Sequence, residues 1–232
     1  MNQITVNLTA VQGRIDRAAA AAGRDPGSVR LLAVSKRHPA DAVVLAAAAG
    51  QKDFGENFVQ EGVAKRAAVA ALSGAADEDL CWHFIGRIQR NKTRQIATHF
   101  DVVHTLDRIA IARRLDAQRE GRPLRVFAQV SLDGDPERGG ASIEELPELL
   151  ECIDSCSNLA LQGLMVLPPP TDDVVLQREG FARVAGLARD LASARRPLGE
   201  LSMGMSGDLE AAIAEGATWI RIGTAIFGPR PG

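Results

Sequence analysis

The sequence predicts an α/β fold, a single (β/α)8 TIM barrel over residues 1–232 with an extra N-terminal helix. Short apolar runs alternate along the chain with longer runs that carry apolar residues at three- and four-residue spacing. This alternation implies parallel strands joined by right-handed helical crossovers. Eight such units within 232 residues are typical of a closed barrel, and a doubly wound open sheet is the main alternative.

Each predicted strand is short and mostly apolar rather than strictly alternating, as expected of strands that are covered on both sides. The predicted strands are Arg30–Ser35, Gln51–Gly55, Leu80–Ile85, Val102–Leu106, Arg125–Ser131, Leu159–Met165, Glu200–Met203 and Thr218–Ile222. The three prolines at 168–170 mark the end of the sixth strand, because a run of prolines cannot continue a sheet.

Helical periodicity fills the remaining intervals. The predicted helices are Ile4–Ala22, Ala40–Ala49, Val59–Leu72, Ile88–Thr98, Arg108–Glu120, Ile143–Ser155, Val174–Ser193 and Asp208–Glu215. Asp107 and Ser142 stand where N-terminal caps are expected, and Gly50 and Gly216 stand where a left-handed residue ends a helix. Because no Ser/Gly-rich linker divides the chain, we expect one domain.

Composition limits both the partners and the compartment. The 27 Lys and Arg nearly balance the 29 Asp and Glu, so no general attraction to nucleic acid or to an anionic membrane is expected. Three cysteines, an odd number, disfavour a disulfide framework and favour a reducing cytoplasm. The first ten residues lack the features of a secretory signal, and no stretch approaches the ~20 apolar residues of a membrane span.

Functional side chains of such barrels lie at the C-terminal ends of the strands. Lys36 follows the first strand beside Arg37, and a partly desolvated lysine near another cation reacts readily with carbonyl groups. The alternative is an ordinary solvated lysine. Asn57 follows the second strand, where its amide either faces the mouth or caps the next helix. His83 alternates with large apolar residues, which favours an interior histidine over a general base.

The last two strands carry the strongest signals. Ser206 lies just before a predicted helix, where its hydroxyl either caps the helix or donates to an anion. Gly223 lets backbone amides approach a phosphate, and Thr224 adds a hydroxyl. Barrels of this class frequently bind phosphate with the loops after strands seven and eight, so we predict a phosphate site here. Arg221 lies within the last strand and needs a partner, because burying an unpaired guanidinium is costly.

Six segments that span nearly the whole chain share one known pattern. They are Ala33–Lys36, Phe54–Glu61, Trp82–Gly86, Gly163–Met165, Leu201–Ser206 and Arg221–Gly228. In this order they resemble the signature blocks of the pyridoxal-phosphate homeostasis protein family. The resemblance implies a single β/α barrel of the alanine-racemase N-terminal-domain type that holds pyridoxal 5′-phosphate. It also implies a role in the homeostasis of vitamin B6 and amino-acid pools, without established catalysis.

The resemblance also implies roles for individual residues. Lys36 would form the Schiff base with the cofactor, and Arg221 would meet its pyridine nitrogen. The other cofactor-binding positions would be Ser206, Gly223 and Thr224 at the phosphate, with Asn57 and Met203 lining the cofactor. The chain departs from the family pattern at four positions, none of them at the lysine: Phe58, Arg87, Ser131 and Arg138 stand where Tyr, Pro, Asn and Lys are common.

Two classes of function then compete. A racemase needs an acid/base group on each face of its substrate, and the resemblance implies a tyrosine opposite Lys36. The chain contains no tyrosine, and it ends soon after the last strand, so we expect no second domain over the site. An arginine at the pyridine nitrogen also weakens the cofactor as an electron sink. We therefore predict a monomeric, cytoplasmic, non-catalytic carrier that supplies apo-enzymes, with a pyridoxal-phosphate-dependent amino-acid racemase as the alternative.

Overall fold

The eight described strands agree with the predicted ones to within one or two residues at either end. In the computed structural model, which describes residues 2–73 and 79–229, they are β1 (Arg30–Val34), β2 (Asp53–Glu56), β3 (Cys81–Phe84), β4 (Val102–Leu106), β5 (Leu124–Val130), β6 (Leu159–Val166), β7 (Glu200–Ser202) and β8 (Trp219–Ile222). They close into a barrel in sequence order, every neighbouring pair is parallel, and β8 pairs with β1. This confirms the predicted barrel and excludes the open sheet.

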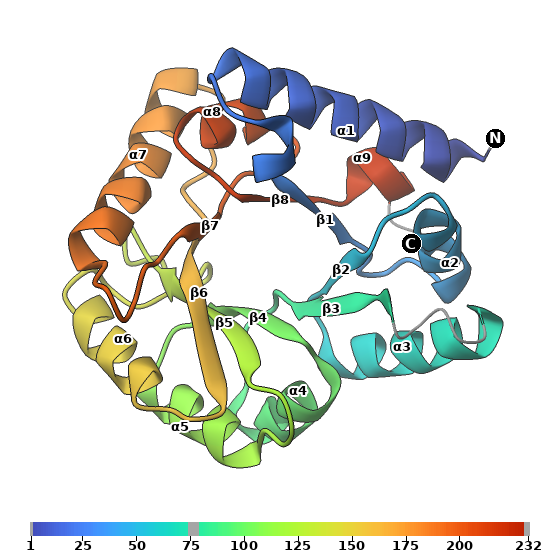
Figure 1. The fold of residues 1–232 in the computed structure, drawn as a ribbon. Coiled ribbons are helices and arrows are strands. Elements are labelled where there is room, and N and C mark those ends of the chain that lie inside the picture. Colours follow the sequence, from blue (N-terminus) through green and yellow to red (C-terminus); the bar gives the residue numbers. More distant parts are fainter. Residues whose placement is uncertain (1, 74–78, 230–232) are drawn as a thin grey trace.

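Helices form an outer layer around the ring of strands, as Figure 1 shows. They are α1 (Gln3–Ala21), α2 (Ala40–Ala48), α3 (Val59–Ser73), α4 (Thr93–His99), α5 (Ile109–Gln118), α6 (Leu146–Asp154), α7 (Val174–Leu191), α8 (Leu209–Ala214) and α9 (Thr224–Phe227), with short 3-10 turns η1 (Pro26–Ser28) and η3 (Arg90–Lys92). The extra N-terminal helix, α1, is confirmed. None of the described helices is long and apolar enough to span a membrane.

The helices predicted from Ile88 and from Ile143 begin later than predicted, with η3 at Arg90 and with α6 at Leu146. The helix expected from Ile88 begins only with η3 and α4, since the Ile88 carbonyl accepts a hydrogen bond from the Arg108 guanidinium (2.8 Å). Asp107 does not cap α5: its carboxylate pairs with Arg108 Nε (2.9 Å), and Arg108 itself precedes the helix in extended backbone. The Ser142 hydroxyl accepts from the Glu145 amide (3.2 Å). Because Glu145 is the N-cap of α6 and Leu146 its first residue, Ser142 stabilises the turn before the helix and does not cap it.

The apolar core has two parts. The larger part lies between the strands and the outer helices. A smaller cluster fills the inside of the barrel and consists of Leu32, Val102, Phe127, Met165 and Trp219. Inward-facing and outward-facing residues therefore alternate along each strand, as the pleat requires.

Helix α1 ties down the two segments that follow β7 and β8. In Figure 1 it runs beside α8 and α9. Asn7 donates to the Ile226 carbonyl (2.8 Å), and Arg14 donates to the Ser206 carbonyl (2.8 Å). Arg24 donates to two carbonyls at the end of α8 and in the turn that follows it. The helix that precedes the barrel thus supports the loops in which the sequence places a phosphate site.

Candidate functional site

A cavity of about 320 Å³ opens at the C-terminal ends of the strands and collects six of the seven predicted site residues. Its lining comprises Lys36, Asn57, Ser206, Arg221, Gly223 and Thr224, together with Val34, Ile85, Met165, Leu167, Met205 and Gly207. These residues come from β1, β2, β3, β6, β7 and β8 or from the loops directly after them. Segments far apart in the sequence therefore meet at one end of the barrel, where such folds hold their ligands.

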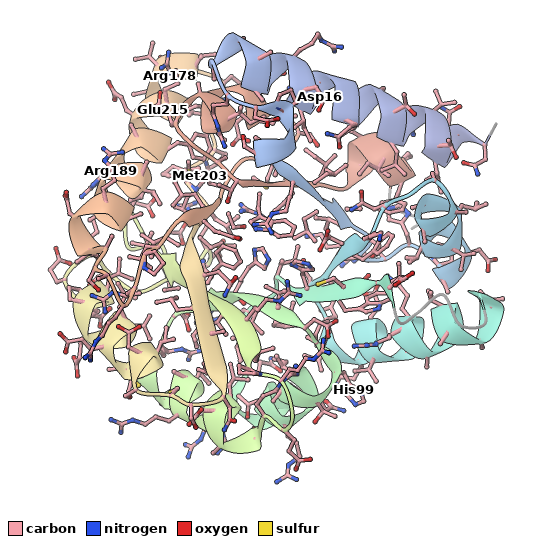
Figure 2. The ribbon with its side chains drawn as sticks, in the orientation of Figure 1. Asp16, His99, Arg178, Arg189, Met203 and Glu215 are labelled. Atoms are coloured by element: carbon pink, nitrogen blue, oxygen red, sulfur yellow. The ribbon has the colours of Figure 1, made fainter. Side chains whose placement is uncertain are left out.

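Met203, labelled in Figure 2, is fully buried in the large core and lies outside this lining. The reason is the pleat: Ser202 faces the barrel interior, where its hydroxyl contacts Arg221, so the next residue faces the helices. Gly204, at φ +93°, then turns the chain and brings Met205 into the cavity wall. The expectation that Met203 lines the cavity is not supported, and Met205, which the sequence analysis did not name as a site residue, lines it instead.

A cluster of charged side chains, which we call the ionic clamp, holds the turn that carries Lys36. The clamp consists of Glu56, Glu61 and Lys65, none of which the sequence analysis singled out as functional. Lys65 Nζ donates to Glu56 Oε1 (2.6 Å), to Glu61 Oε1 (3.0 Å) and to the Ser35 carbonyl (2.6 Å). These bonds use all three donors of an ammonium group.

The clamp binds the backbone on both sides of Lys36. Besides the Ser35 carbonyl, it binds the Ser35 hydroxyl, which donates to Glu56 Oε1 (2.6 Å). On the other side, the Arg37 amide donates to Glu61. Burial raises the pKa of the Glu56 carboxyl, and the neighbouring Lys65 ammonium acts in the opposite direction. The ion pair is therefore what favours the charged form of a carboxyl that is fully buried.

Arg221 enters the cavity from inside the barrel, with only 4% of its surface exposed. One terminal nitrogen donates to Ser202 Oγ (2.9 Å) and the other to the Val166 carbonyl (2.9 Å). Burial lowers the pKa of the guanidinium to about 10, and Asp208 acts in the opposite direction. The group is therefore still a cation at neutral pH. These two bonds use two of its five donors, so a ligand at the wall has donors to meet.

Asn57 carries an unsatisfied polar atom at the same wall. Its Oδ1 is buried and has no hydrogen-bond partner among the described residues. This oxygen therefore does not cap α3, and a ligand donor or water would satisfy it. A close backbone contact fixes the Asn57 position, because a Cβ on Gly86 would lie 1.9 Å from the Asn57 carbonyl oxygen. Only glycine fits at position 86.

Two larger depressions lie beside this cavity at the mouth of the barrel, at about 410 and 520 Å³. The first shares Asn57, Ile85 and Leu167 with the Lys36 cavity. Neither larger depression brings a lysine together with the buried guanidinium, which the Lys36 cavity does. The Lys36 cavity therefore has the best-defined chemistry: a primary amine, a buried cation and hydroxyl groups around one small volume.

Comparison with known proteins decides the family. The model of the alanine racemase N-terminal domain family matches residues 6–231. The pyridoxal phosphate homeostasis protein of Pseudomonas aeruginosa is 52% identical over 99% of this chain and 97% of its own length. The corresponding Escherichia coli K12 protein is 44% identical over 99% and 98%. The chain belongs to the pyridoxal phosphate homeostasis protein family.

Solved structures agree with this membership. PipY of Synechococcus elongatus, solved with pyridoxal phosphate bound, is 39% identical, with a TM-score of 0.85 over 97% of this chain and 100% of that one. Alanine racemase from Corynebacterium glutamicum is 17% identical, with a TM-score of 0.62 over 97% of this chain and 62% of that one. The second likeness shows the shared barrel only.

The departures from the family pattern lie outside the lining of the Lys36 cavity. Phe58, Arg87 and Arg138 line the 410 Å³ depression, and Ser131 lines the 520 Å³ depression. Arg138 is held there by Asp133 and by Asp135 (2.7 Å), so its charge is paired within its own loop. In this member of the family, the substitutions therefore alter the neighbouring depressions and leave the lining of the Lys36 cavity unchanged.

Proposed function

We propose that the protein binds pyridoxal 5′-phosphate in the Lys36 cavity and serves the intracellular homeostasis of this form of vitamin B6. The single observation that carries the proposal is the meeting of Lys36, Arg221, Ser206, Gly223 and Thr224 around about 320 Å³. Relatives named pyridoxal phosphate homeostasis protein, and the PipY structure with the cofactor bound, support the same ligand. The cavity is of the size that small ligands occupy.

Each group of the cofactor has a chemical counterpart in the wall. When bound, the cofactor supplies an aldehyde that reacts with amines. Lys36 would supply the primary amine that reacts with this aldehyde, with loss of water. Ser206, Gly223 and Thr224 hold the phosphate, and Arg221 donates toward the pyridine nitrogen. Asn57 Oδ1, which lacks a partner in the described part of the chain, accepts from a ligand hydroxyl or a bridging water.

The exposed rim suits a carrier. Met205 lines the cavity and is 42% exposed, so solvent reaches the ligand side of the wall. Other amines then have a route to the cofactor, and an acceptor protein could take it up there. We propose that a monomer in the cytoplasm hands the cofactor to pyridoxal-phosphate-dependent apo-enzymes. Sedimentation of the purified protein tests whether it is a monomer. Mixing the cofactor-loaded protein with an apo-enzyme, and measuring how much cofactor is transferred, tests the delivery.

The decisive experiment is covalent trapping at Lys36. The protein is mixed with pyridoxal phosphate, reduced with borohydride and digested, and the modified peptide is identified by mass spectrometry. We expect one adduct, on Lys36, and loss of both the adduct and the visible absorbance band in Lys36→Ala. Lys92→Ala is the matched control, because Lys92 lies at the same mouth but lines the neighbouring depression. An adduct retained in Lys36→Ala would refute the site, and rapid racemisation of an L-amino acid by the wild type would refute a non-catalytic carrier.

A further inference from the structure

A row of hydrogen-bonded side chains crosses the inside of the barrel and ends on Arg221. Asp53 Oδ1 lies 2.9 Å from His83 Nε2, and His83 Nδ1 lies 2.8 Å from His104 Nε2. His104 Nδ1 lies 2.7 Å from Ser202 Oγ, which accepts from Arg221 at 2.9 Å. Barrel interiors are usually filled with branched apolar residues, so a continuous polar row needs an explanation.

The two end groups of the row, the Asp53 carboxylate and the Arg221 guanidinium, determine which atom carries each proton between them. A carboxylate only accepts, so His83 Nε2–H donates to Asp53. The neutral His83 then accepts at Nδ1 from His104 Nε2–H, and the neutral His104 accepts at Nδ1 from the Ser202 hydroxyl. The Ser202 oxygen in turn accepts from the guanidinium, which only donates. With both imidazoles neutral, every donor faces an acceptor, and all hydrogen bonds run in one direction, from Arg221 to Asp53.

The surroundings keep both imidazoles neutral. His83 and His104 are fully buried, and burial is the main cause that lowers the pKa of each ring. Aromatic side chains exclude water from them: His104 stacks on Phe127 with ring centres 4.4 Å apart, and Trp219 lies 5.0 Å from the His83 ring. A protonated imidazole would also lose the acceptor that its neighbour in the row needs.

The outer end of the row includes Cys81, which together with Asp53 and His83 has the composition of a metal site. Two observations favour hydrogen bonding over metal ligation. Burial raises the pKa of the Cys81 thiol to about 12, so the sulfur is protonated at neutral pH. Arg125 donates to the same sulfur at 2.9 Å, which brings a cation to the position that a metal ion would approach. The cluster is therefore the terminus of the row.

We propose that Asp53, His83, His104 and Ser202 are positioning residues that hold the Arg221 guanidinium toward the pyridine nitrogen of pyridoxal phosphate; this inference rests on the proposed function. The row fixes one terminal nitrogen of Arg221, and the Val166 carbonyl fixes the other. These two hydrogen bonds together fix the orientation of the guanidinium plane. Every hydrogen bond in the row points the same way, so the oxygen that faces Arg221 is an acceptor. This acceptor stabilises a buried cation that forms no ion pair with a carboxylate among the described residues.

The first test reads the protons of the row in the cofactor-free protein. Long-range nitrogen–proton correlation spectra of isotope-labelled protein distinguish the two imidazole tautomers. We expect both His83 and His104 to be neutral and protonated at Nε2 at pH 7. In Ser202→Ala, the Nδ1 resonance of His104 should shift, because its donor is gone. An Nδ1-protonated or doubly protonated His104 in the wild type would overturn the assigned direction.

The second test reads the effect at the ligand. Ser202→Ala should weaken pyridoxal phosphate binding about tenfold, which corresponds to about 1.4 kcal/mol. The same variant should bind the analogue that carries carbon in place of the pyridine nitrogen as well as the wild type does. Thr93→Ala is the matched control, because it removes another fully buried hydroxyl that lies outside the row. It should change neither affinity.

The outcomes separate the two proposals. If Ser202→Ala weakens both ligands equally, or neither, the positioning role is wrong while the cofactor site stands. If the wild type binds neither ligand, the proposed function is wrong, and the positioning role is overturned with it. The imidazole tautomers, measured without ligand, would then still show whether all hydrogen bonds of the row run from Arg221 to Asp53.

Discussion

Behind Lys36 the protein buries charges, whereas behind Arg221 it buries neutral imidazoles. The ionic clamp joins Lys65 to Glu56 and Glu61 over distances of 2.6 and 3.0 Å. The row behind Arg221 has one carboxylate at its far end, Asp53, and only neutral groups between. Each network contacts a segment of the cavity wall, yet the two place their charges differently.

The difference follows from what each network holds. Lys36 precedes a strained turn, because Arg37 has left-handed backbone at φ 62°, a conformation that costs a non-glycine residue about 1 kcal/mol or more. The clamp binds backbone groups of this turn, and charged partners make the stronger hydrogen bonds. Arg221 lies in a regular strand, so only its side-chain direction needs to be fixed. In this protein, charged side chains hold the backbone turn at Arg37, and neutral side chains hold the direction of the Arg221 side chain.

The largest effect should come from breaking the clamp. Lys65→Met would leave Glu56 buried without its cation, and removal of one partner of a buried ion pair costs about 3–5 kcal/mol. We expect a loss of that size in the free energy of unfolding, measured by urea denaturation at neutral pH. Lys52→Met, which changes an exposed lysine, is the matched control and should have little effect. A clamp variant as stable as the control would show that the ion pair does not hold the turn.

Acidification distinguishes the clamp from a simple packing loss. Burial already raises the pKa of Glu56, and removal of Lys65 would raise it further. A carboxyl with a raised pKa in the folded state is most favourable below that pKa, because it is then protonated and neutral. The stability gap between Lys65→Met and the wild type should therefore narrow as the pH falls through the raised pKa. A gap that is constant with pH would indicate lost packing only.

A smaller effect should come from interrupting the neutral row. His104→Leu leaves the His83 and Ser202 groups without a partner, and each unsatisfied buried group costs about 1–3 kcal/mol. The wild-type pKa of His104 is well below its usual range, so below about pH 6.5 the unfolded chain binds a proton that the folded chain does not. Wild-type stability thus falls on acidification, and the variant lacks that contribution.

The two gaps should narrow on acidification for different reasons. The His104→Leu gap should narrow below about pH 6.5, where an unfolded histidine gains its proton. The Lys65→Met gap should narrow only where Glu56 itself becomes protonated. His99→Leu, on the half-buried end of α4, controls for the loss of a histidine as such. A His104→Leu gap that did not change with pH would show that the folded protein does not keep the proton off His104.

Local patterns predicted the barrel and most of the cavity, because strand ends in this fold meet at one rim. Lys36, Arg221 and Thr224 could be placed there from their positions after or within strands. The networks could not be predicted in the same way. Lys65 lies on a helix and is separated by 30 residues from the Ser35 carbonyl that it binds, and Ser202 is separated by 98 residues from His104. Periodicity predicts which face of a helix or strand a residue occupies, but it does not predict which residue of another element that side chain contacts.

Met203 is a different case, because the alternation along the strand does predict the direction of its side chain. A residue on β7 faces either the barrel interior or the helices, and the hydroxyl of Ser202 needs a polar partner inside. That assignment forces Met203 outward. By contrast, the left-handed turn at Gly204 that brings Met205 into the cavity requires glycine, because an added Cβ would lie 2.5 Å from the Ala212 side chain and 2.9 Å from that of Ile220. Those contacts are set by the packing of α8 and β8, which short-range sequence patterns do not contain.

The smallest effect concerns the support that α1 gives to the Ser206 loop of the cavity wall. Arg14 pairs with Glu210 and donates to the Ser206 carbonyl (2.8 Å). The ion pair is largely exposed, so Arg14→Ala should lower the free energy of unfolding by less than about 1 kcal/mol. Its effect on the ligand should be selective, because the proposed site places the phosphate at this loop: pyridoxal phosphate binding should weaken about twofold, and binding of pyridoxal should not change. Arg17→Ala, an exposed position one turn along the same helix, should alter neither affinity. Equal weakening of both ligands by Arg14→Ala would mean that α1 supports the whole rim rather than the phosphate loop.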